Sequence, residues 1–409
     1  MAKGYAPKKA VLEKYADVLV NFALGGGKGI KKGDVVCING SQSCEPLFLA
    51  VRNAVLDAGG HVIMQYQPEG EGRYNLSREF FERAKDHQLD HFPAKYYKGL
   101  IDEIDHLLFI VGDNHPHALK GIDPQKVMRR GASRKPFMDW RNEKEHAGKF
   151  TWCIALWGTP AMAKEAKLSI KEYWQQIIDA CFLNEKDPIA KWKETYRGME
   201  KYRQKLNRLA PQTDRLHVEG PDINLWIKLG EKRQWLCGSG RNIPSFEIFT
   251  SPDWRGTEGW IRFNQPLYRD GNYANGIELW FEKGKVVKVK AKKGEAYVKQ
   301  MIAMPGADRV GEFSLTDSRH SRITKFMAET LYDENIGGPQ GNTHIAVGSA
   351  YADTYAGDPS KLTEKDKERL GYNDSSVHTD MFSTARRTVT AHLKDGKTKV
   401  IYKDGQFVL

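Results

Sequence analysis

The first half of the chain alternates short apolar segments with longer amphipathic ones. We expect strands in this half at residues 34–40, 61–66, 106–112 and 151–158. The runs at 106–112 and 151–158 are bounded by turn residues, which is typical of strands buried on both faces of a sheet. We expect helices at residues 11–23, 45–59, 160–183 and 185–209. Strands that alternate with helices predict a doubly wound α/β domain, a parallel sheet with helices on both faces.

The pattern changes at about residue 215, where short alternating segments replace the long helices. We expect strands within residues 223–230, 234–240, 276–294 and 399–409. In the third of these, Ile277, Leu279 and Phe281 alternate with polar residues before a Lys283-Gly284 turn, as in a β-hairpin. The second half is therefore predicted to be a mainly antiparallel, barrel-like β domain. A turn-rich segment after the long charged helix places the boundary between domains 1–213 and 214–409.

Length and composition agree with a folded protein of two domains. The chain has 409 residues, more than a single hydrophobic core usually holds, and its 40% hydrophobic and 28% charged residues are ordinary proportions. Its apolar runs are too short and too often interrupted by charge to span a membrane. The first twenty residues lack the apolar run and cleavage site of a secretory signal. We therefore expect a cytoplasmic protein without a membrane partner.

The charge and the cysteines exclude two further classes of site. The formal net charge is +11, but basic and acidic residues are interleaved along most of the chain, and no zinc-finger, RNP or basic-zipper motif is present. We therefore expect no nucleic-acid partner. Five cysteines are scattered without a CxxC pair, which favours buried reduced thiols over disulfides or a cysteine zinc site.

Candidate metal ligands occur in the second half, and the sharpest pair is His378 and Asp380. In an extended segment, side chains two residues apart point to the same face, so this imidazole and carboxylate would be presented together. An imidazole with carboxylates suits zinc, cobalt or manganese, whereas calcium and magnesium prefer oxygen ligands alone. A surface or helix-capping histidine remains the alternative for an isolated pair of this kind.

Three other carboxylates and one histidine lie in segments of the same half. Glu334 precedes a glycine-rich loop that leads back to His344, and an ordinary polar surface loop is the alternative interpretation. Glu247 and Glu312 each stand alone in a short apolar segment, where a charge is unfavourable unless it is paired or bound to a metal. Together with the histidine–aspartate pair, these residues favour a metal centre more than any one of them does.

The sequence resembles the thermophilic-type metallo-aminopeptidases, the family of aminopeptidase T and aminopeptidase S. The resemblance covers nearly the whole chain, and its segments occur in the family's order and at close to its spacing. It is carried by NIPSFEIFTSP at 242–252, GEFSL at 311–315, TLYDEN at 330–335, HIAVGSAY at 344–351 and SSVHTD at 375–380. The stretch between Glu334 and His344 is longer here than in the short form of the family.

The resemblance implies a role for each candidate residue. The metal ligands would be Glu247, Glu312, His344, His378 and Asp380. Tyr351 falls on the family's active-site tyrosine, with core packing as the alternative, and Glu334 would bind metal or act as a base. Five ligands are too few for two separate coordination shells, so we expect Glu247 or Glu312 to bridge two divalent ions, which would be zinc, cobalt or manganese.

The predicted function is that of a metal-dependent aminopeptidase that removes N-terminal residues from short peptides with a water activated by two metals. Two alternatives remain open: a two-domain protein that binds peptides or amino acids without catalysis, and a metallo-phosphoesterase. The resemblance also implies a homodimer. In this interpretation domain 214–409 is catalytic, and domain 1–213 walls the cavity and mediates oligomerisation.

Overall fold

The computed structural model describes residues 5–69, 76–269 and 271–409, and its chain divides into two compact units. The N-terminal unit comprises the chain up to Glu194 together with Ser239–Ser245 and Lys325–Tyr332. The C-terminal unit comprises Thr195–Gly238, Phe246–Thr324 and Asp333–Leu409. The functions assigned to domains 1–213 and 214–409 by the sequence remain predictions.

The N-terminal unit is built on a parallel sheet. Among the described residues its strands are β1 (Val35–Ser41), β2 (His61–Gln67), β3 (His106–Val111), β4 (Thr151–Leu156) and β7 (Asn242–Ile243). They lie in the order β2-β1-β3-β4-β7, with Ile38 of β1 opposite Met64 of β2 and Leu108 of β3. Strands β1, β3 and β4 coincide with predicted strands and are largely buried, as expected for a sheet covered on both faces.

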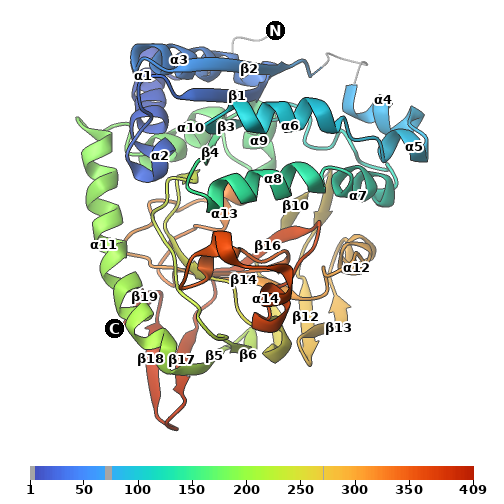
Figure 1. Cartoon of the computed structure of the whole chain (residues 1–409), viewed down its shortest axis with the longest axis vertical. Coiled ribbons are helices and arrows are strands. Elements are labelled where there is room, and N and C mark those ends of the chain that lie inside the picture. Colours follow the sequence, from blue (N-terminus) through green and yellow to red (C-terminus); the bar gives the residue numbers. More distant parts are fainter. Residues whose placement is uncertain (1–4, 70–75, 270) are drawn as a thin grey trace. The chain divides into compact units, whose positions relative to one another are not determined.

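Helices cover both faces of this sheet (Figure 1). They are α1 (Lys9–Val18), a π-helix (Leu19–Ala23), α2 (Leu24–Gly27), α3 (Glu45–Asp57), α4 (Leu76–Arg83), α5 (Asp86–Leu89), α6 (Ala94–Glu103), α7 (Pro124–Ala132), α8 (Lys135–His146), α9 (Pro160–Glu165) and α10 (Ile170–Ala180). Helices α6 and α8 pack on Cys37, Leu107 and Trp152 of one face. Helix α3 packs on β1 and β2 and contacts α1. The predicted doubly wound arrangement is confirmed.

The C-terminal unit is mainly antiparallel, as predicted. One sheet has the order β13-β12-β9-β6-β5-β17-β18-β19, a second has the order β16-β15-β14-β8, and β10 pairs with β11. The strands of the first sheet are β5 (Thr213–Gly220), β6 (Ile223–Lys228), β9 (Glu258–Arg262), β12 (Glu278–Glu282), β13 (Lys285–Lys290), β17 (Thr388–Leu393), β18 (Thr398–Lys403) and β19 (Gln406–Phe407). The short pair is β10 (Leu267–Arg269) and β11 (Asn272–Ala274). Two helices, α12 (Glu295–Ile302) and α14 (Glu364–Leu370), accompany them.

Two further helices pass from one unit to the other. Helix α11 spans Pro188–Leu209, and the short α13 spans Thr330–Asp333. The chain enters the C-terminal unit at Phe246 and again at Asp333, next to residues that the sequence analysis singled out.

Two predicted elements differ in the structure. Residues 160–183 form two helices rather than one, because Lys167 adopts a left-handed conformation and Ser169 caps a new helix with a side-chain bond to the Glu172 amide. Residues 234–240 form only an isolated bridge, between Leu236 and Phe249, instead of a strand. The glycines at 238 and 240 have positive φ angles there, which interrupts extended pairing.

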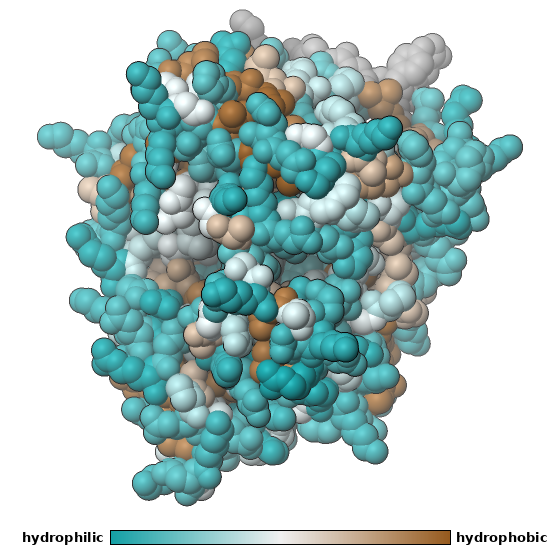
Figure 2. Space-filling model, viewed as in Figure 1, coloured by the Kyte–Doolittle hydropathy of each residue, from teal (hydrophilic) through white to brown (hydrophobic). Residues whose placement is uncertain are grey.

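On the face shown in Figure 2, most side chains are hydrophilic, and apolar residues lie among them in groups. Throughout residues 5–69, 76–269 and 271–409, we find no helix that is both long and apolar enough to cross a membrane. The five cysteines are free thiols, and Cys37, Cys44, Cys153 and Cys181 are buried.

Candidate metal centre

The candidate centre is built on the four-stranded sheet of the C-terminal unit. Its strands are β8 (Glu247–Thr250), β14 (Val310–Thr316), β15 (Asn342–Gly348) and β16 (His378–Ser383). Every residue of β14 and β15 is buried, so the sheet has no solvent-facing side at its centre. Side chains alternate between the two faces of a strand, and polar residues therefore gather on one face when they recur every second position.

The cross-strand register places the five predicted ligands on the same face. Glu247 pairs with Thr316, Ala346 lies between Glu312 and Asp380, and Gly348 pairs with His378. Glu312 is in regular register with Ser314 and Thr316, and the register shifts only between Val310 and Glu312. Strand by strand, the face carries Glu247, Glu312 with Ser314, His344 with Ala346, and His378 with Asp380.

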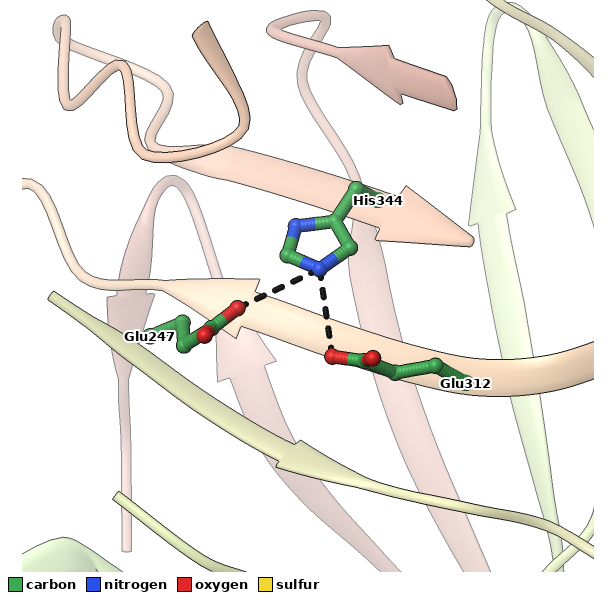
Figure 3. A group of neighbouring side chains, drawn as sticks. All are labelled: Glu247, Glu312 and His344. Carbon is green, nitrogen blue, oxygen red and sulfur yellow. Dashed lines mark hydrogen bonds and ion pairs between the residues drawn. The ribbon is translucent and has the colours of Figure 1, made fainter. Parts of the chain in front are cut away.

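His344 contacts two carboxylates, which come from the paired strands β8 and β14. Its Nε2 lies 3.2 Å from Glu247 Oε2 and 3.3 Å from Glu312 Oε1, and Figure 3 shows both carboxylates reaching the same ring nitrogen. The imidazole is only 1% exposed and Glu312 only 4%. Charged groups this deeply buried need compensation, and the three side chains provide it for one another.

Glu312 also contacts the second histidine. Its other oxygen, Oε2, lies 3.4 Å from His378 Nε2, which in turn is 3.5 Å from Asp380 Oδ1. The two oxygens of one carboxylate therefore point to two different imidazoles. Glu312 thus joins the two histidines of the cluster.

Both imidazoles are oriented by backbone carbonyls behind them. His344 Nδ1 lies 3.2 Å from the carbonyl oxygen of Glu334, and His378 Nδ1 lies 2.8 Å from that of Ser349. A carbonyl can only accept, so each Nδ1 carries the proton and each Nε2 faces the carboxylates. This second hydrogen bond is typical of metal-binding histidines, because it fixes the ring and the tautomer.

The side chains of the cluster strongly affect the pKa values of one another. Burial opposes a charge on His344, but hydrogen bonds to Glu247 and Glu312 outweigh it and raise the pKa of the imidazole well above its usual value. Burial likewise opposes a charge on His378, and Asp380 and Glu312 outweigh it, so its pKa is also raised. The pKa of Asp380 is lowered, because the charge of His378 outweighs the effect of burial. The imidazoles and carboxylates of the cluster thus favour the charged forms of one another.

Glu334 is the remaining carboxyl of the cluster. It is 6% exposed, and burial, followed by the charges of Asp380 and Glu247, raises its pKa well above the usual value. One of its oxygens lies close enough to ligand atoms of His344 and Asp380 to form a group with them. The glycine-rich loop does bring Glu334 back to His344, as the sequence analysis predicted.

Tyr351 lies at the edge of the cluster. Its ring centroid is 4.8 Å from that of His378 and 5.8 Å from that of Phe249. The Tyr351 amide donates to Ser251 Oγ at 2.8 Å, which fixes the backbone where β15 has ended. The side chain is half-buried, so it is neither a core residue nor a freely exposed one.

The ligand atoms fall into three overlapping groups, in each of which all atoms lie within 4.8 Å of one another. The groups are Glu247 with Glu312 and His344, Glu312 with His378 and Asp380, and Glu334 with His344 and Asp380. Imidazole nitrogens mixed with carboxylate oxygens suit a zinc-type divalent ion, and the donor set therefore fits a metal.

Comparison with known proteins identifies the family. The family described as "Thermophilic metalloprotease (M29)" matches residues 8–407, nearly the whole chain. The chain belongs to this family. It is therefore an enzyme of the metallopeptidase class, as the sequence analysis predicted.

Named relatives match this metallopeptidase over nearly its full length. Aminopeptidase PepS of Streptococcus thermophilus is 28% identical, with 98% of each chain covered. Aminopeptidase T of Thermus thermophilus is 28% identical, with 98% of this chain and 99% of the relative covered. The solved structure of wild-type AmpT from Thermus thermophilus superposes with a TM-score of 0.81 at 25% identity, covering 98% of this chain and all of the other. The predicted fold class is thereby confirmed.

The structure adds three residues to the site that the sequence analysis did not single out. Ser314 donates its hydroxyl to Glu247 Oε2 at 3.1 Å, and Arg269 donates to the His378 carbonyl at 2.7 Å. The side chain of Asn335 contacts Glu334. Two-residue spacing from Glu312 could have revealed Ser314, whereas Arg269 comes from a distant hairpin and leaves no local signal.

Proposed function

We propose that this metallopeptidase is an aminopeptidase that removes N-terminal residues from short peptides, using two divalent ions held by the cluster. The observation that carries the proposal is the position of Glu312, whose two oxygens face two different histidines. Relatives named aminopeptidase match over nearly the full length of the chain, which supports the same reaction here.

The ligands divide between two adjacent positions. Glu247, Glu312 and His344 would hold one ion, while Glu312, His378 and Asp380 would hold the other. Glu312 is the bridging carboxylate in this assignment, which selects one of the two bridging residues that the sequence left open. Divalent ions bound there supply a Lewis acid for a water molecule and for the scissile carbonyl.

We assign catalytic roles to Glu334 and Tyr351, the two candidate residues that are not ligands in this assignment. Glu334 forms a third candidate group with His344 and Asp380, but each ion already has three ligands in this assignment. We therefore assign Glu334 as the base that accepts a proton from the attacking water and returns it to the leaving amine. Tyr351 lies beside His378 and can donate its phenol hydrogen bond to the oxygen on which negative charge develops. Glu334 is buried, and surroundings of low polarity strengthen its electrostatic interactions.

Metal identity, cellular location and assembly also remain part of the proposal. Zinc, cobalt or manganese fits the imidazole and carboxylate ligands better than calcium. We expect a cytoplasmic homodimer, because enclosure between subunits would restrict the site to short or unfolded chains. Light scattering tests the assembly: a mass near 46.5 kDa would indicate a monomer.

A side-by-side assay tests the proposed reaction. The purified protein, loaded with cobalt or zinc, is offered amino-acid anilides, N-acetylated anilides and phosphate esters. We expect hydrolysis of free anilides only, since an exopeptidase requires the α-amino group that acetylation removes. Preferred hydrolysis of phosphate esters would indicate a phosphoesterase instead, and tight peptide binding without hydrolysis would indicate a binding protein.

A further inference from the structure

Asn335 lies directly after Glu334 and has no exposed surface. Its Oδ1 accepts a hydrogen bond from the Phe246 amide at 2.7 Å, and its Nδ2 donates to Glu334 Oε1 at 3.3 Å. The backbone amide of Phe246 can only donate, so it determines which end of the side chain is the oxygen. The Nδ2 group must then face Glu334.

The backbone of this segment is held independently of the Asn335 side chain. Asn342 donates to the Asp333 carbonyl, His344 donates to the Glu334 carbonyl, and Ser321 donates to the Asn335 carbonyl. Three successive carbonyls are therefore fixed by side chains from other segments. The amide of Asn335 is not needed to place the chain here, and what it adds is the orientation of the Glu334 carboxyl group.

The same amide connects the two segments that carry Glu334 and Glu247. Phe246 precedes Glu247 at the beginning of β8, and β8 pairs directly with β14, the strand of Glu312. A buried bond from Asn335 to Phe246 thus ties the Glu334 carboxyl to the ligand-bearing sheet. Precise placement matters because a small displacement of a catalytic group lowers turnover strongly.

We propose that Asn335 is a positioning residue, whose side-chain amide orients the carboxyl group of Glu334 and locks it to the strand that begins at Glu247. This inference rests on the proposed function, since it assumes that Glu334 acts on the attacking water. Asn335 itself contacts neither ligand set, and it acts through Glu334.

A double-mutant cycle tests the proposal. Asn335→Ser, Glu334→Gln and the double variant are assayed for anilide hydrolysis at saturating cobalt, so that changes in metal affinity do not enter kcat. We expect Asn335→Ser to lower kcat about tenfold to a hundredfold with KM nearly unchanged, as for a lost hydrogen bond to a charged group. In the Glu334→Gln background the same change should lower kcat less than about twofold, because no carboxylate is left to orient.

Asn207 provides a matched control. Its side chain also bonds at both ends, to the amide and carbonyl of Trp235, but neither bond involves a candidate ligand. Asn207→Ser should lower the thermal midpoint while leaving kcat of the folded protein unchanged in both backgrounds.

A second readout uses the chelated protein and needs no turnover. If the two side chains are bonded, the double variant should shift the thermal midpoint by less than the sum of the shifts of the Asn335 and Glu334 single variants. If the losses in kcat of the two single variants multiply in the double variant, or if their shifts in thermal midpoint add, Asn335 does not position Glu334. The proposed function would still stand in that case. A wild-type protein that hydrolyses no anilide would instead overturn the proposed function, and this inference with it.

Discussion

The inner strands β1, β3 and β4 of the parallel sheet and the strands β14 and β15 of the four-stranded sheet are largely buried, but their side chains differ. In the first, Ile38 and Leu108 contribute to an apolar core, and the strands could be recognised from their hydrophobicity. In the second, Glu312 and His344 are just as inaccessible to solvent, yet they are ionisable. Burial of such groups is unfavourable unless something compensates for it.

The difference separates residues that stabilise the fold from residues that perform chemistry. The apolar sheet gains stability from every buried side chain. The charged sheet gathers carboxylates and imidazoles that balance one another only in part and that divalent ions would balance better. Changes in the first sheet should therefore affect stability, and changes in the second should affect metal binding and turnover.

The largest effect is expected from the ligand strand β16. His378→Ala or Asp380→Ala should reduce metal occupancy and lower kcat/KM on the order of a thousandfold, because the second ion loses one of its protein ligands. Metal analysis of the dialysed variants, together with anilide assays, measures both quantities. A His378→Ala variant that keeps two ions would contradict its assignment as a ligand.

Thr379 is the matched control for these variants. It lies between the two ligands on the same strand but on the opposite face, and its hydroxyl has no hydrogen-bond partner among the residues that the structure describes. Thr379→Val keeps the shape of the side chain and should keep both ions and full turnover.

Tyr351→Phe should have the next largest effect. Removing one hydrogen-bond donor to the transition state lowers kcat about a hundredfold to a thousandfold. Metal content should stay at the wild-type level, because we assign the phenol to the transition state and not to the ligands. Wild-type turnover in this variant would mean that Tyr351 only packs against His378.

Leu108→Ala tests the apolar sheet. This side chain is fully buried at the centre of β3, and its truncation should destabilise the protein by about 2–5 kcal/mol. Denaturant unfolding measures the change, and the activity of the remaining folded protein should stay near that of the wild type. A loss of turnover without a loss of stability would contradict the claim that this sheet contributes to stability and not to catalysis.

Glu329 allows a comparison with the ionisable groups of the four-stranded sheet. It belongs to the N-terminal unit and to none of the candidate ligand groups. Burial, with a smaller contribution from Asp113, raises the pKa of Glu329 to about 7. A carboxyl whose pKa is raised on folding favours the folded state at low pH, and that advantage is lost as the pH rises from about 4.5 through 7.

Glu329→Gln should therefore stabilise the protein by about 1–3 kcal/mol at pH 8 relative to the wild type, with little difference at pH 5. Denaturant unfolding at the two pH values provides the measurement. An equal effect of the substitution at both pH values would contradict the raised pKa.

Much of the fold could be predicted, because apolar periodicity is local. Runs such as 106–112 and 151–158 correspond to strands β3 and β4. Prediction failed where individual residues decide the backbone: the left-handed Lys167 divides a helix, and the glycines near 238 prevent a strand. These are effects of backbone conformation that hydrophobicity does not report.

The site could be predicted only in part. Residue spacing suggested His378 with Asp380, and the segments around Glu247, Glu312 and His344 made those residues candidates as well. The resemblance to a family gave each of them its role as a ligand, and this assignment remains a prediction. Register and hydrogen bonds could not be read from the sequence. Asn335 and Arg269 act through contacts across 89 and 109 positions of the chain, so no local pattern indicates them. Likewise, spacing alone could not distinguish Glu247 from Glu312 as the bridging carboxylate.

The central claim is that the charged sheet holds two divalent ions required for peptide hydrolysis. Its most direct test is metal analysis of the purified protein, with anilide hydrolysis measured before chelation, after it, and after addition of zinc, cobalt or manganese. We predict two ions per chain, loss of activity on chelation, and recovery when one of these metals is added. Full activity after exhaustive chelation, with no metal detected, would contradict the account.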